Sequence, residues 1–261
     1  MTALKTPRQQ RMVAALGELA WQLVLELTST VAAGQTTAQL AEQAQALLAK
    51  NRCTAPFKSF TNAQGERFGW PVCVSLNAAV VNGPPSDAVV VAPGDVVSVA
   101  LAVEREGLVG KAAHTVVVEA LPGQAAIQRA ITGAQQVLDT LPEQAPLLAT
   151  VLDLTRVLEQ AAWASGAYPI TESGGHGTGL VHQSEPWIPN ATADVDATLA
   201  TTPLVSGWGL VPMPMWAVPV TVKTGDPRVV AWHLASDGWT YVVLNTMWPF
   251  MWPKRWCGLR G

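Results

Sequence analysis

The stretch from Gly174 to Ile188 reads GGHGTGLVHQSEPWI, and it surrounds one histidine, His176, with glycines. Because glycine has no Cβ, a backbone rich in it lets a ligand or another chain segment approach closely. Gly-His-Gly alone is common in turns, since glycine clusters mostly mark loops. The longer pattern, in which Glu185 and Pro186 follow at a set distance, is far more specific and is the most informative feature of the chain.

Length and composition predict one large domain that covers residues 1–261. No linker rich in serine and glycine and no block of charge divides the 261 residues. Hydrophobic residues make up 49% and charged residues 13%, which indicates a large core and a sparsely charged surface. The net charge of -3 provides no basic surface for nucleic acid or acidic lipid. We therefore expect neither nucleic acid nor a membrane as a partner.

The first residues lack the uninterrupted apolar stretch of a signal peptide, and no later run is long enough for a transmembrane helix. We therefore expect a cytoplasmic protein. Its three cysteines, Cys53, Cys73 and Cys257, are widely spaced and form no Cys-x-x-Cys pair. They are expected to be reduced thiols, and the spacing excludes a zinc cluster.

Helix and strand signals follow each other along the chain. Thr6 and Gln9 predict a capping box with a proline between them, and Thr36 with Gln39 repeats the capping pair, so two helices are expected near the N-terminus. Apolar residues then take the period of strands. The expected strands, separated by Gly and Pro turns and typical of an antiparallel meander, are 72–76, 88–92, 95–103 and 114–118.

The same order recurs after Gly123. The expected helices lie near 124–140 and 144–165, and the expected strands lie near 175–187, 207–222, 229–234 and 239–244. Two helices followed by strands, twice over, predict a pseudo-two-fold α+β domain with a site between its halves.

This order, together with the Gly-His-Gly pattern, resembles the methionine aminopeptidase and creatinase family over nearly the whole chain. Three further segments carry the resemblance: Ser75–Asp87, the Pro93-Gly-Asp turn before a strand, and the DGWT sequence of Asp237–Thr240. The chain is most similar to type I methionine aminopeptidases. The resemblance implies the pita-bread fold, an α+β fold in which a curved antiparallel sheet carries its helices on the outer face.

The resemblance also implies where metal ligands should stand. Peptidases of this family hold two divalent ions with two aspartates, one histidine and two glutamates. His176 keeps the histidine. The aspartate positions hold Ala100 and Lys111, the first glutamate position holds Met213, and an ungapped count places the last at Pro253. Such ions prefer several carboxylate oxygens together, so one imidazole cannot hold them, and we expect no metal and no other cofactor.

Two histidines that help to bind the peptide carbonyl in the family are also altered. The first becomes Asn82, which donates hydrogen bonds but cannot shuttle protons near neutral pH. The second falls on Gln183 in an ungapped alignment, which places His182 at an aromatic position of the pocket wall. A compensating shift would instead restore His182 as the functional histidine, and the sequence leaves both alternatives open.

Loss of the carboxylates reverses the expected charge of the pocket. Lys111, His176 and, in one alignment, His182 stand in a site that is acidic in the family, while Ala100 and Met213 make it wider and more apolar. Such a pocket favours an anionic or electron-rich ligand, and an ammonium can stabilise negative charge in place of a metal. The competing interpretation is that Lys111 is a solvated or ion-paired strand lysine.

Other side chains complete the predicted site. Trp70, Cys73 and Trp239 match positions of the family's apolar side-chain pocket. Seven of the 11 tryptophans follow Gly207, and residues 245–261 form a Trp- and Pro-rich tail that diverges from the family. This tail either lines the pocket with indoles or packs in the core or an interface. We expect the core or an interface, which would allow a homo-oligomer.

The leading hypothesis is a repurposed, metal-independent enzyme that performs acid–base chemistry on a small anionic molecule with an aromatic or apolar part. Its reaction would be an isomerisation, cyclisation, elimination or hydrolysis. The candidate catalytic residues are His176 for proton transfer, Lys111 for charge stabilisation, and His182. The candidate ligand-binding residues are Asn82, Trp70, Cys73, Gln183, Met213 and Trp239.

Two alternatives stand beside this hypothesis. A pseudoenzyme that binds a peptide terminus or a partner protein without turnover explains the lost ligands equally well, and it explains the tail better. A residual methionine aminopeptidase is the third alternative. It would need stoichiometric metal together with cleavage of a peptide that begins with methionine.

Overall fold

Two capping boxes begin the N-terminal helices, as the sequence predicts. The Thr6 hydroxyl accepts a hydrogen bond from the Gln9 backbone, and the Gln9 side chain accepts one from the Thr6 backbone. Thr36 and Gln39 repeat this arrangement. These reciprocal bonds satisfy backbone N–H groups that have no partner within a helix. The two helices are α1, Pro7–Ser29, and α2, Thr37–Lys50.

The computed structural model describes residues 6–61, 65, 67–77, 79, 81–171, 173–205, 207–220, 233–234 and 240–245. The strands are β1 Val72–Leu76, β2 Val96–Arg105, β3 Leu108–Val117, β4 Tyr168–Pro169, β5 Gly174–Thr178, β6 Ser184–Pro189, β7 Gly209–Val211, β8 Met215–Val220, β9 His233–Leu234 and β10 Thr240–Asn245. They form three antiparallel sheets with the orders β1-β2-β3, β6-β5-β7 and β4-β8-β10-β9. The later helices are α3 Ala125–Gln144, α4 Val151–Ala164 and α5 Ala197–Thr201, and a short 3-10 helix, η1, spans Pro56–Ser59.

The first sheet is the expected meander, in which β2 pairs with β1 on one side and with β3 on the other. The predicted strand 88–92 is wrong, because Val90 makes only an isolated bridge to Thr36. The backbone of this segment is used elsewhere: Thr37 N donates to the Val89 carbonyl, and Val91 N donates to the Gln35 carbonyl. The segment therefore holds the start of α2 instead of extending the meander.

The helix predicted from residue 144 begins later. Residues 145–147 form a separate 3-10 turn, and a capping box between Thr150 and Asp153 then starts α4. The pair of helices before the second group of strands is nevertheless present, as the recurring order predicts.

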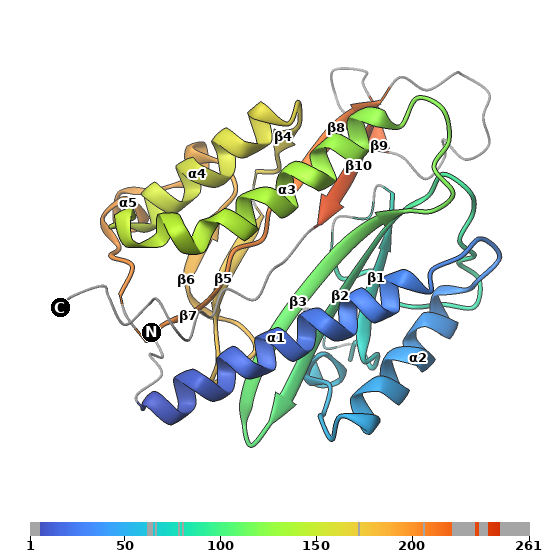
Figure 1. Cartoon of the computed structure of the whole chain (residues 1–261), viewed down its shortest axis with the longest axis horizontal. Coiled ribbons are helices and arrows are strands. Elements are labelled where there is room, and N and C mark those ends of the chain that lie inside the picture. The colour runs from blue at the N-terminus through green and yellow to red at the C-terminus, as the bar shows by residue number, and fades with distance from the viewer. Residues whose placement is uncertain are drawn as a thin grey trace.

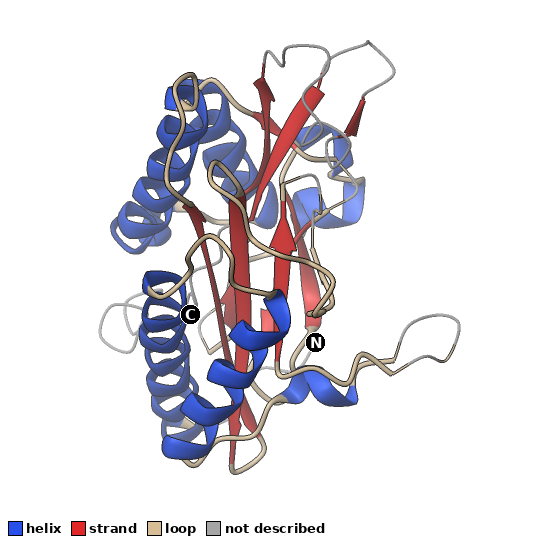
Figure 2. Ribbon diagram, turned by 90° about the vertical axis from the view of Figure 1, so that its right-hand side faces the viewer, coloured by secondary structure: helices blue, strands red, loops and turns tan. Residues whose placement is uncertain are grey.

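The long helices lie over one face of the strands (Figures 1 and 2). α1 and α2 pack against β1–β3, while α3 and α4 pack against later strands. Leu27 and Leu101 belong to the first buried core, and Leu158 and Trp216 belong to the second. The predicted α+β class, with helices on one side of antiparallel strands, is confirmed.

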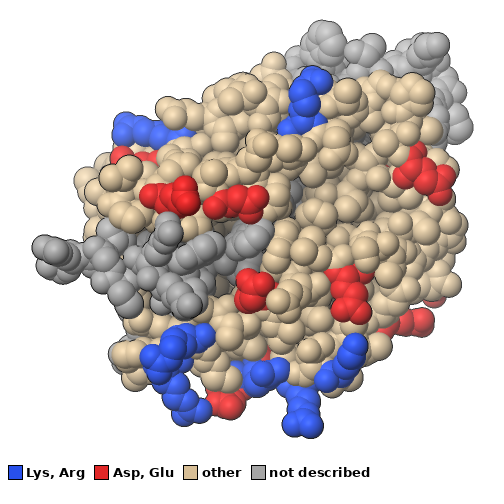
Figure 3. Space-filling model, in the orientation of Figure 1, with Lys and Arg blue, Asp and Glu red and all other residues tan. Residues whose placement is uncertain are grey.

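The surface agrees with the composition. Charged side chains are scattered over a mostly uncharged face in Figure 3. Among the described helices, none has both the length and the apolar character needed to cross a membrane.

The two faces of β3 have different surroundings. The ring of His114 meets Trp21 of α1 edge-on at 5.5 Å, and its Nδ1 lies 2.9 Å from the Thr28 hydroxyl. Because side chains alternate along a strand, Lys111 points to the opposite face, away from α1. That opposite face carries the candidate site.

Gly110 sets how closely α1 approaches β3. A Cβ at this position would overlap the backbone of Leu16 and Gly17. The close approach therefore requires glycine, and it places the neighbouring Lys111 deep in the fold.

We expect Gly110→Ala to destabilise the protein by about 2 to 3 kcal/mol, since a helix backbone cannot give way as a flexible side chain does. Gly123→Ala is the matched control: Gly123 has open space around it, and only its positive φ of 95° opposes an alanine. That strain is about 1 kcal/mol. Urea denaturation measures both losses of unfolding free energy, and equal losses would contradict the close approach.

Candidate functional site

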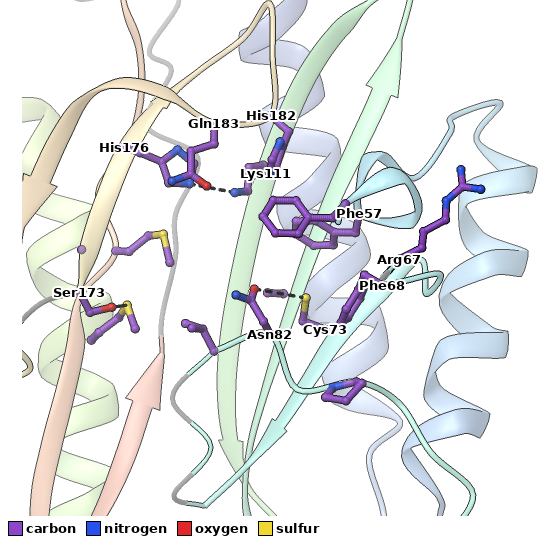
Figure 4. Close-up of a pocket in the computed structure, with 17 residues that line it drawn as sticks. Phe57, Arg67, Phe68, Cys73, Asn82, Lys111, Ser173, His176, His182 and Gln183 are labelled. Atoms are coloured by element: carbon purple, nitrogen blue, oxygen red, sulfur yellow. Dashed lines mark hydrogen bonds between the residues drawn. The ribbon is translucent and has the colours of Figure 1, made fainter. Parts of the chain in front are cut away.

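A cavity of about 460 Å³ lies where the two halves of the chain meet. One side is formed by β1, β2, β3 and the segments that flank β1, and the other by β5, the loop after it and the segment that leads into β8 (Figure 4). A cavity thus lies at the predicted position of the site, between the halves.

Lys111 and His176 form the polar centre of this pocket. Lys111 extends from β3 and His176 from β5, and the two side chains point toward each other (Figure 4). Lys111 Nζ and His176 Nε2 lie 2.9 Å apart, and each residue is only 4% exposed. Two residues 65 positions apart in the chain therefore share a buried hydrogen bond.

The other ring nitrogen of His176 decides which group donates in that bond. His176 Nδ1 lies 2.8 Å from the carbonyl oxygen of Gly177, which can only accept, so Nδ1 carries a proton. Burial first, and then the charge of Lys111, lower the pKa of His176 from 6.5 to about 3. The imidazole is therefore neutral at pH 7, and its Nε2 accepts a hydrogen bond from the Lys111 ammonium.

The glycines of the motif let β5 fit between its neighbours. β5 is the middle strand of its sheet. A Cβ at Gly175 would overlap the carbonyl of Val211 in β7, and a Cβ at Gly177 would overlap the carbonyl of Glu185 in β6. Glycine in a strand often marks a close approach of two backbones. The glycines on either side of His176 therefore allow the close strand packing that holds His176 in place.

Lys111 is a buried cation without an acidic partner among the described residues. Burial lowers the pKa of its ammonium from 10.5 to about 8, while Cys73 acts in the opposite direction. Its Nζ lies 5.5 Å from the centroid of the Phe57 ring, which is within the range of a cation–π contact. The ion pairs found in the described part of the chain do not include Lys111. The interpretation of Lys111 as a solvated or ion-paired lysine is therefore wrong for the described structure.

The remaining ligand positions do not fit a dinuclear metal centre. Ala100 and Met213 line the pocket at two of the expected carboxylate positions, and neither supplies an anionic oxygen. The ammonium of Lys111 repels cations. No group of three or more His, Cys, Asp or Glu side chains within the described residues is arranged to hold an ion, and Pro253 lies outside those residues. Hard divalent ions need several oxygen ligands, so the side chains present do not fit them.

Asn82 and Cys73 line the pocket, as predicted. Asn82 has a positive φ of 56°, a conformation that asparagine adopts more readily than most residues. The Cys73 thiol lies 3.9 Å from Asn82 Oδ1, which accepts from it. Burial raises the pKa of the Cys73 thiol from 9.0 to about 12, so it stays protonated. The polar tip of Asn82 and a neutral thiol therefore share this wall.

His182 belongs to an aromatic wall of the pocket. Its ring is edge-on to Phe57 and Phe60, at centroid distances of 6.2 and 5.0 Å. Burial, and then the charge of Lys111, lower the pKa of His182 from 6.5 to about 4, so it is neutral at pH 7. Gln183 is exposed and lines the same pocket. Both His182 and Gln183 therefore line the pocket, and His182 stands among the aromatic rings.

Three of the chain's four phenylalanines line the pocket, and the sequence analysis missed all three. Phe57, Phe60 and Phe68 come from the segment between α2 and β1. Arg67 also lines the cavity and is largely exposed, with its Nε donating to the Lys58 carbonyl. The sequence does contain a signal for them. Aromatic residues that cluster in a loop, outside any helix or strand pattern, indicate a surface that contacts a ligand or another segment.

Trp70 does not line the pocket, contrary to the prediction. It packs against the core between the N-terminal helices and the first sheet, where its large apolar ring is partly buried. Trp239 and the tail from residue 246 onward lie outside the described residues. Cys53 and Cys73 are buried free thiols, as predicted, and Cys257 is also outside the described residues.

Comparisons of the sequence point to peptidases. A methionine aminopeptidase of Helicobacter pylori (strain J99) is 26% identical over 245 residues, which cover 93% of this chain and 89% of that protein. A methionine aminopeptidase of Aquifex aeolicus is 32% identical over 129 residues, which cover 49% of each chain.

Solved structures show the same fold. The methionine aminopeptidase of Thermotoga maritima matches with a TM-score of 0.72 at 24% identity, covering 95% of this chain and 92% of that one. A prolidase of Pyrococcus furiosus matches with a TM-score of 0.60 at 16% identity, covering 93% and 61%. These likenesses confirm the predicted pita-bread fold. The sequence profile of metallopeptidase family M24 matches residues 11–210, and because this is well over half of the 261 residues, the chain belongs to that family.

Proposed function

We propose that this chain performs metal-independent acid–base chemistry on a small anionic molecule, with Lys111 in the place of the metal ions of related peptidases. The observation that carries the proposal is the 2.9 Å hydrogen bond between Lys111 Nζ and His176 Nε2. His176 Nε2 thus meets the Lys111 ammonium in the place where a related peptidase would hold a metal ion. The positive charge at this place belongs to a side chain of the protein itself.

The charge of the pocket supports an anionic ligand. A buried ammonium is unfavourable unless a negative group compensates it, and the described residues offer it no carboxylate. Arg67 adds a second cation to the pocket lining. A carboxylate of the ligand would compensate Lys111 and accept its hydrogen bonds. A peptide N-terminus is itself positive, so the pocket disfavours the group that an aminopeptidase must bind.

The walls of the pocket support a ligand with an aromatic or apolar part. Phe57, Phe60 and Phe68 form one side, and Met213 and Met215 contribute to another. A cavity of about 460 Å³ is within the size range of sites for small molecules, which combine apolar walls with a few polar groups.

The pKa values support catalytic roles that differ from those of the sequence-based hypothesis. Lys111, with a pKa of about 8, can give or take a proton near neutral pH, as a general acid or base must. His176, with a pKa of about 3, mainly accepts the hydrogen bond that orients Lys111. Asn82 Nδ2 has no acceptor within the described structure and is available to a ligand. His182 serves as a neutral wall.

A non-catalytic binding protein is the second candidate. The observation that favours it is that both pocket histidines are shielded from water, His176 almost fully and His182 partly. This burial, and then the charge of Lys111, lowers the pKa of His176 to about 3 and that of His182 to about 4, which makes each a weak base at pH 7. Such a pocket can hold a carboxylate, for example the C-terminus of a peptide, without converting it. Lys111→Arg separates the candidates, because arginine keeps the charge but does not exchange protons near neutral pH.

The buried ammonium predicts a rise of stability with pH. The folded-state pKa of Lys111, about 8, lies below its ordinary 10.5, so between these values the unfolded chain holds the additional proton and the free energy of unfolding rises. From pH 8 to pH 9 this rise should be about 1 kcal/mol. Above pH 9 the raised pKa of Cys73 acts in the opposite direction. Urea denaturation at pH 8 and pH 9 measures the difference.

Two variants test whether Lys111 causes the rise in unfolding free energy between pH 8 and pH 9. Lys111→Met should remove it and should raise stability at pH 7 by up to about 3 kcal/mol, because the desolvated charge is gone. Lys50→Met is the matched control, since Lys50 is exposed at the end of α2, and it should keep the rise. A Lys111→Met protein with the unchanged pH dependence would contradict the assignment.

Ligand binding tests the charge of the pocket. We expect benzoate to bind more tightly than benzamide, which has the same shape but no charge, in isothermal titration calorimetry. Lys111→Met should weaken benzoate binding by roughly 10-fold or more, as expected for a lost charge-assisted hydrogen bond. Lys50→Met should leave it unchanged. Equal affinity for the acid and the amide would contradict an anion site.

The residual peptidase is tested by metal content and cleavage. After incubation with Co²⁺ or Mn²⁺ and desalting, we expect the protein to retain far less than stoichiometric metal, because the ligand positions hold Ala100, Lys111 and Met213. It should also fail to cleave a peptide that begins with methionine. Stoichiometric metal together with cleavage would overturn the proposed function.

A further inference from the structure

We propose that Lys111 is a covalent catalytic residue that forms an imine with a small oxo acid, a carboxylate that also carries a ketone or aldehyde group. This inference rests on the proposed function, since it starts from the anion-binding pocket and names the chemical class of the anion. It adds a bond between Lys111 Nζ and the carbonyl carbon of the ligand.

Lys111 differs from the other lysines of the described residues. Lys50 and Lys58 are exposed, and Lys58 Nζ donates to the side chain of Gln45 at 2.6 Å. Lys111 is 4% exposed and lines the pocket. A desolvated amine in an apolar pocket is the usual setting of lysines that form Schiff bases. Because no described carboxylate pairs with Lys111, its nitrogen is available to a ligand.

His176 is placed to move the protons that imine formation requires. Its Nδ1–H donates to the Gly177 carbonyl at 2.8 Å, so its Nε2 lone pair is held toward Lys111 Nζ at 2.9 Å. Nε2 takes a proton from the ammonium as the nitrogen attacks the carbonyl carbon. A second ammonium hydrogen passes from nitrogen to the former carbonyl oxygen and makes it the hydroxyl of the carbinolamine. The proton held by Nε2 then goes to this hydroxyl, which leaves as water. His176 is therefore a positioning residue and a transient proton holder.

The step is balanced without another reactant. The ammonium and the carbonyl group combine to give an iminium ion and one molecule of water. The bond between nitrogen and carbon forms, the carbonyl C–O bond breaks, and two hydrogens of the ammonium leave in the water. The single positive charge stays on nitrogen, so the electrostatic surroundings that accommodate the ammonium also accommodate the product.

The walls around Lys111 favour the iminium. The Phe57 ring, 5.5 Å from Nζ, offers its face to a cation before and after the reaction. Ala100 and Met213 replace polar groups with apolar ones close to the amine, which limits the water that would hydrolyse the product. Asn82 offers an amide donor to the oxygen of the ligand. The lost metal ligands thus leave a setting suited to covalent chemistry.

An iminium is also an electron-accepting group, a role that a metal ion fills in related enzymes. It draws electrons from the bonds of the neighbouring carbon, so a proton on that carbon becomes easier to remove. Reactions that begin with such a proton, including isomerisation and elimination, then proceed without a metal ion.

The test traps the imine by reduction. The full-length protein is incubated near neutral pH with pyruvate and sodium cyanoborohydride, then digested and analysed by mass spectrometry. We expect the reduced adduct at Lys111 to form at least about tenfold faster than at Lys50 or Lys58, because of these three described lysines Lys111 is the desolvated one. The three lysines are compared within one sample, so the measurement does not depend on a variant that folds.

Two variants refine the result. Lys111→Arg should show no adduct at this position while Lys50 and Lys58 react as before. His176→Gln should slow trapping at Lys111 alone, whereas a general loss of the fold would make the three lysines react alike. Equal rates at the three lysines overturn the imine. In that case, benzoate binding that still depends on Lys111 leaves the proposed function standing, whereas benzoate binding independent of Lys111 removes both.

Discussion

The pocket depends on a buried ammonium bonded to a neutral imidazole. Lys111 donates to His176, and the Gly177 carbonyl holds the imidazole so that it can only accept. A carboxylate at the position of Ala100 or Met213 would pair with the ammonium and cancel the charge that a ligand meets. Because Ala100 and Met213 carry no charge, the ammonium of Lys111 meets no carboxylate among the described residues, and its side chain holds it in place.

Two hydrophobic cores that hold the fold together are built from residues outside the pocket. They lie between the long helices and the strands, and residues such as Leu27 and Leu158 fill them without contact with the site chemistry. Gly110 allows α1 to lie against β3, and Gly175 allows β5 to lie against β7. These contacts hold the strands that present Lys111 and His176. The contacts that build the family M24 fold are thus separate from the side chains that form the site, and function resides in a site carried by the fold.

Predictions from sequence succeeded where the signal was local. The capping pair of Thr6 and Gln9 spans three residues and begins α1 as expected. They failed where hydrogen bonds to distant residues decided the outcome: the apolar segment around Val90 holds the start of α2 and forms no strand. The positions of Trp70 and Phe57 were not predicted for the same reason. Neither residue belongs to a helix or strand pattern, so the sequence does not show that Trp70 packs on the core and that Phe57 lines the pocket.

The sequence by itself determined most of the helices and strands, the pita-bread family and the absence of a carboxylate at Ala100, Lys111 and Met213, because these follow from short patterns and from residue identity. Only the tertiary structure decided that Lys111 meets His176, which nitrogen of the imidazole accepts, and that phenylalanines complete the wall. The reason is physical. Hydrogen-bond direction and pKa depend on distance and burial, and both arise when residues 65 positions apart are brought to 2.9 Å in a site shielded from water.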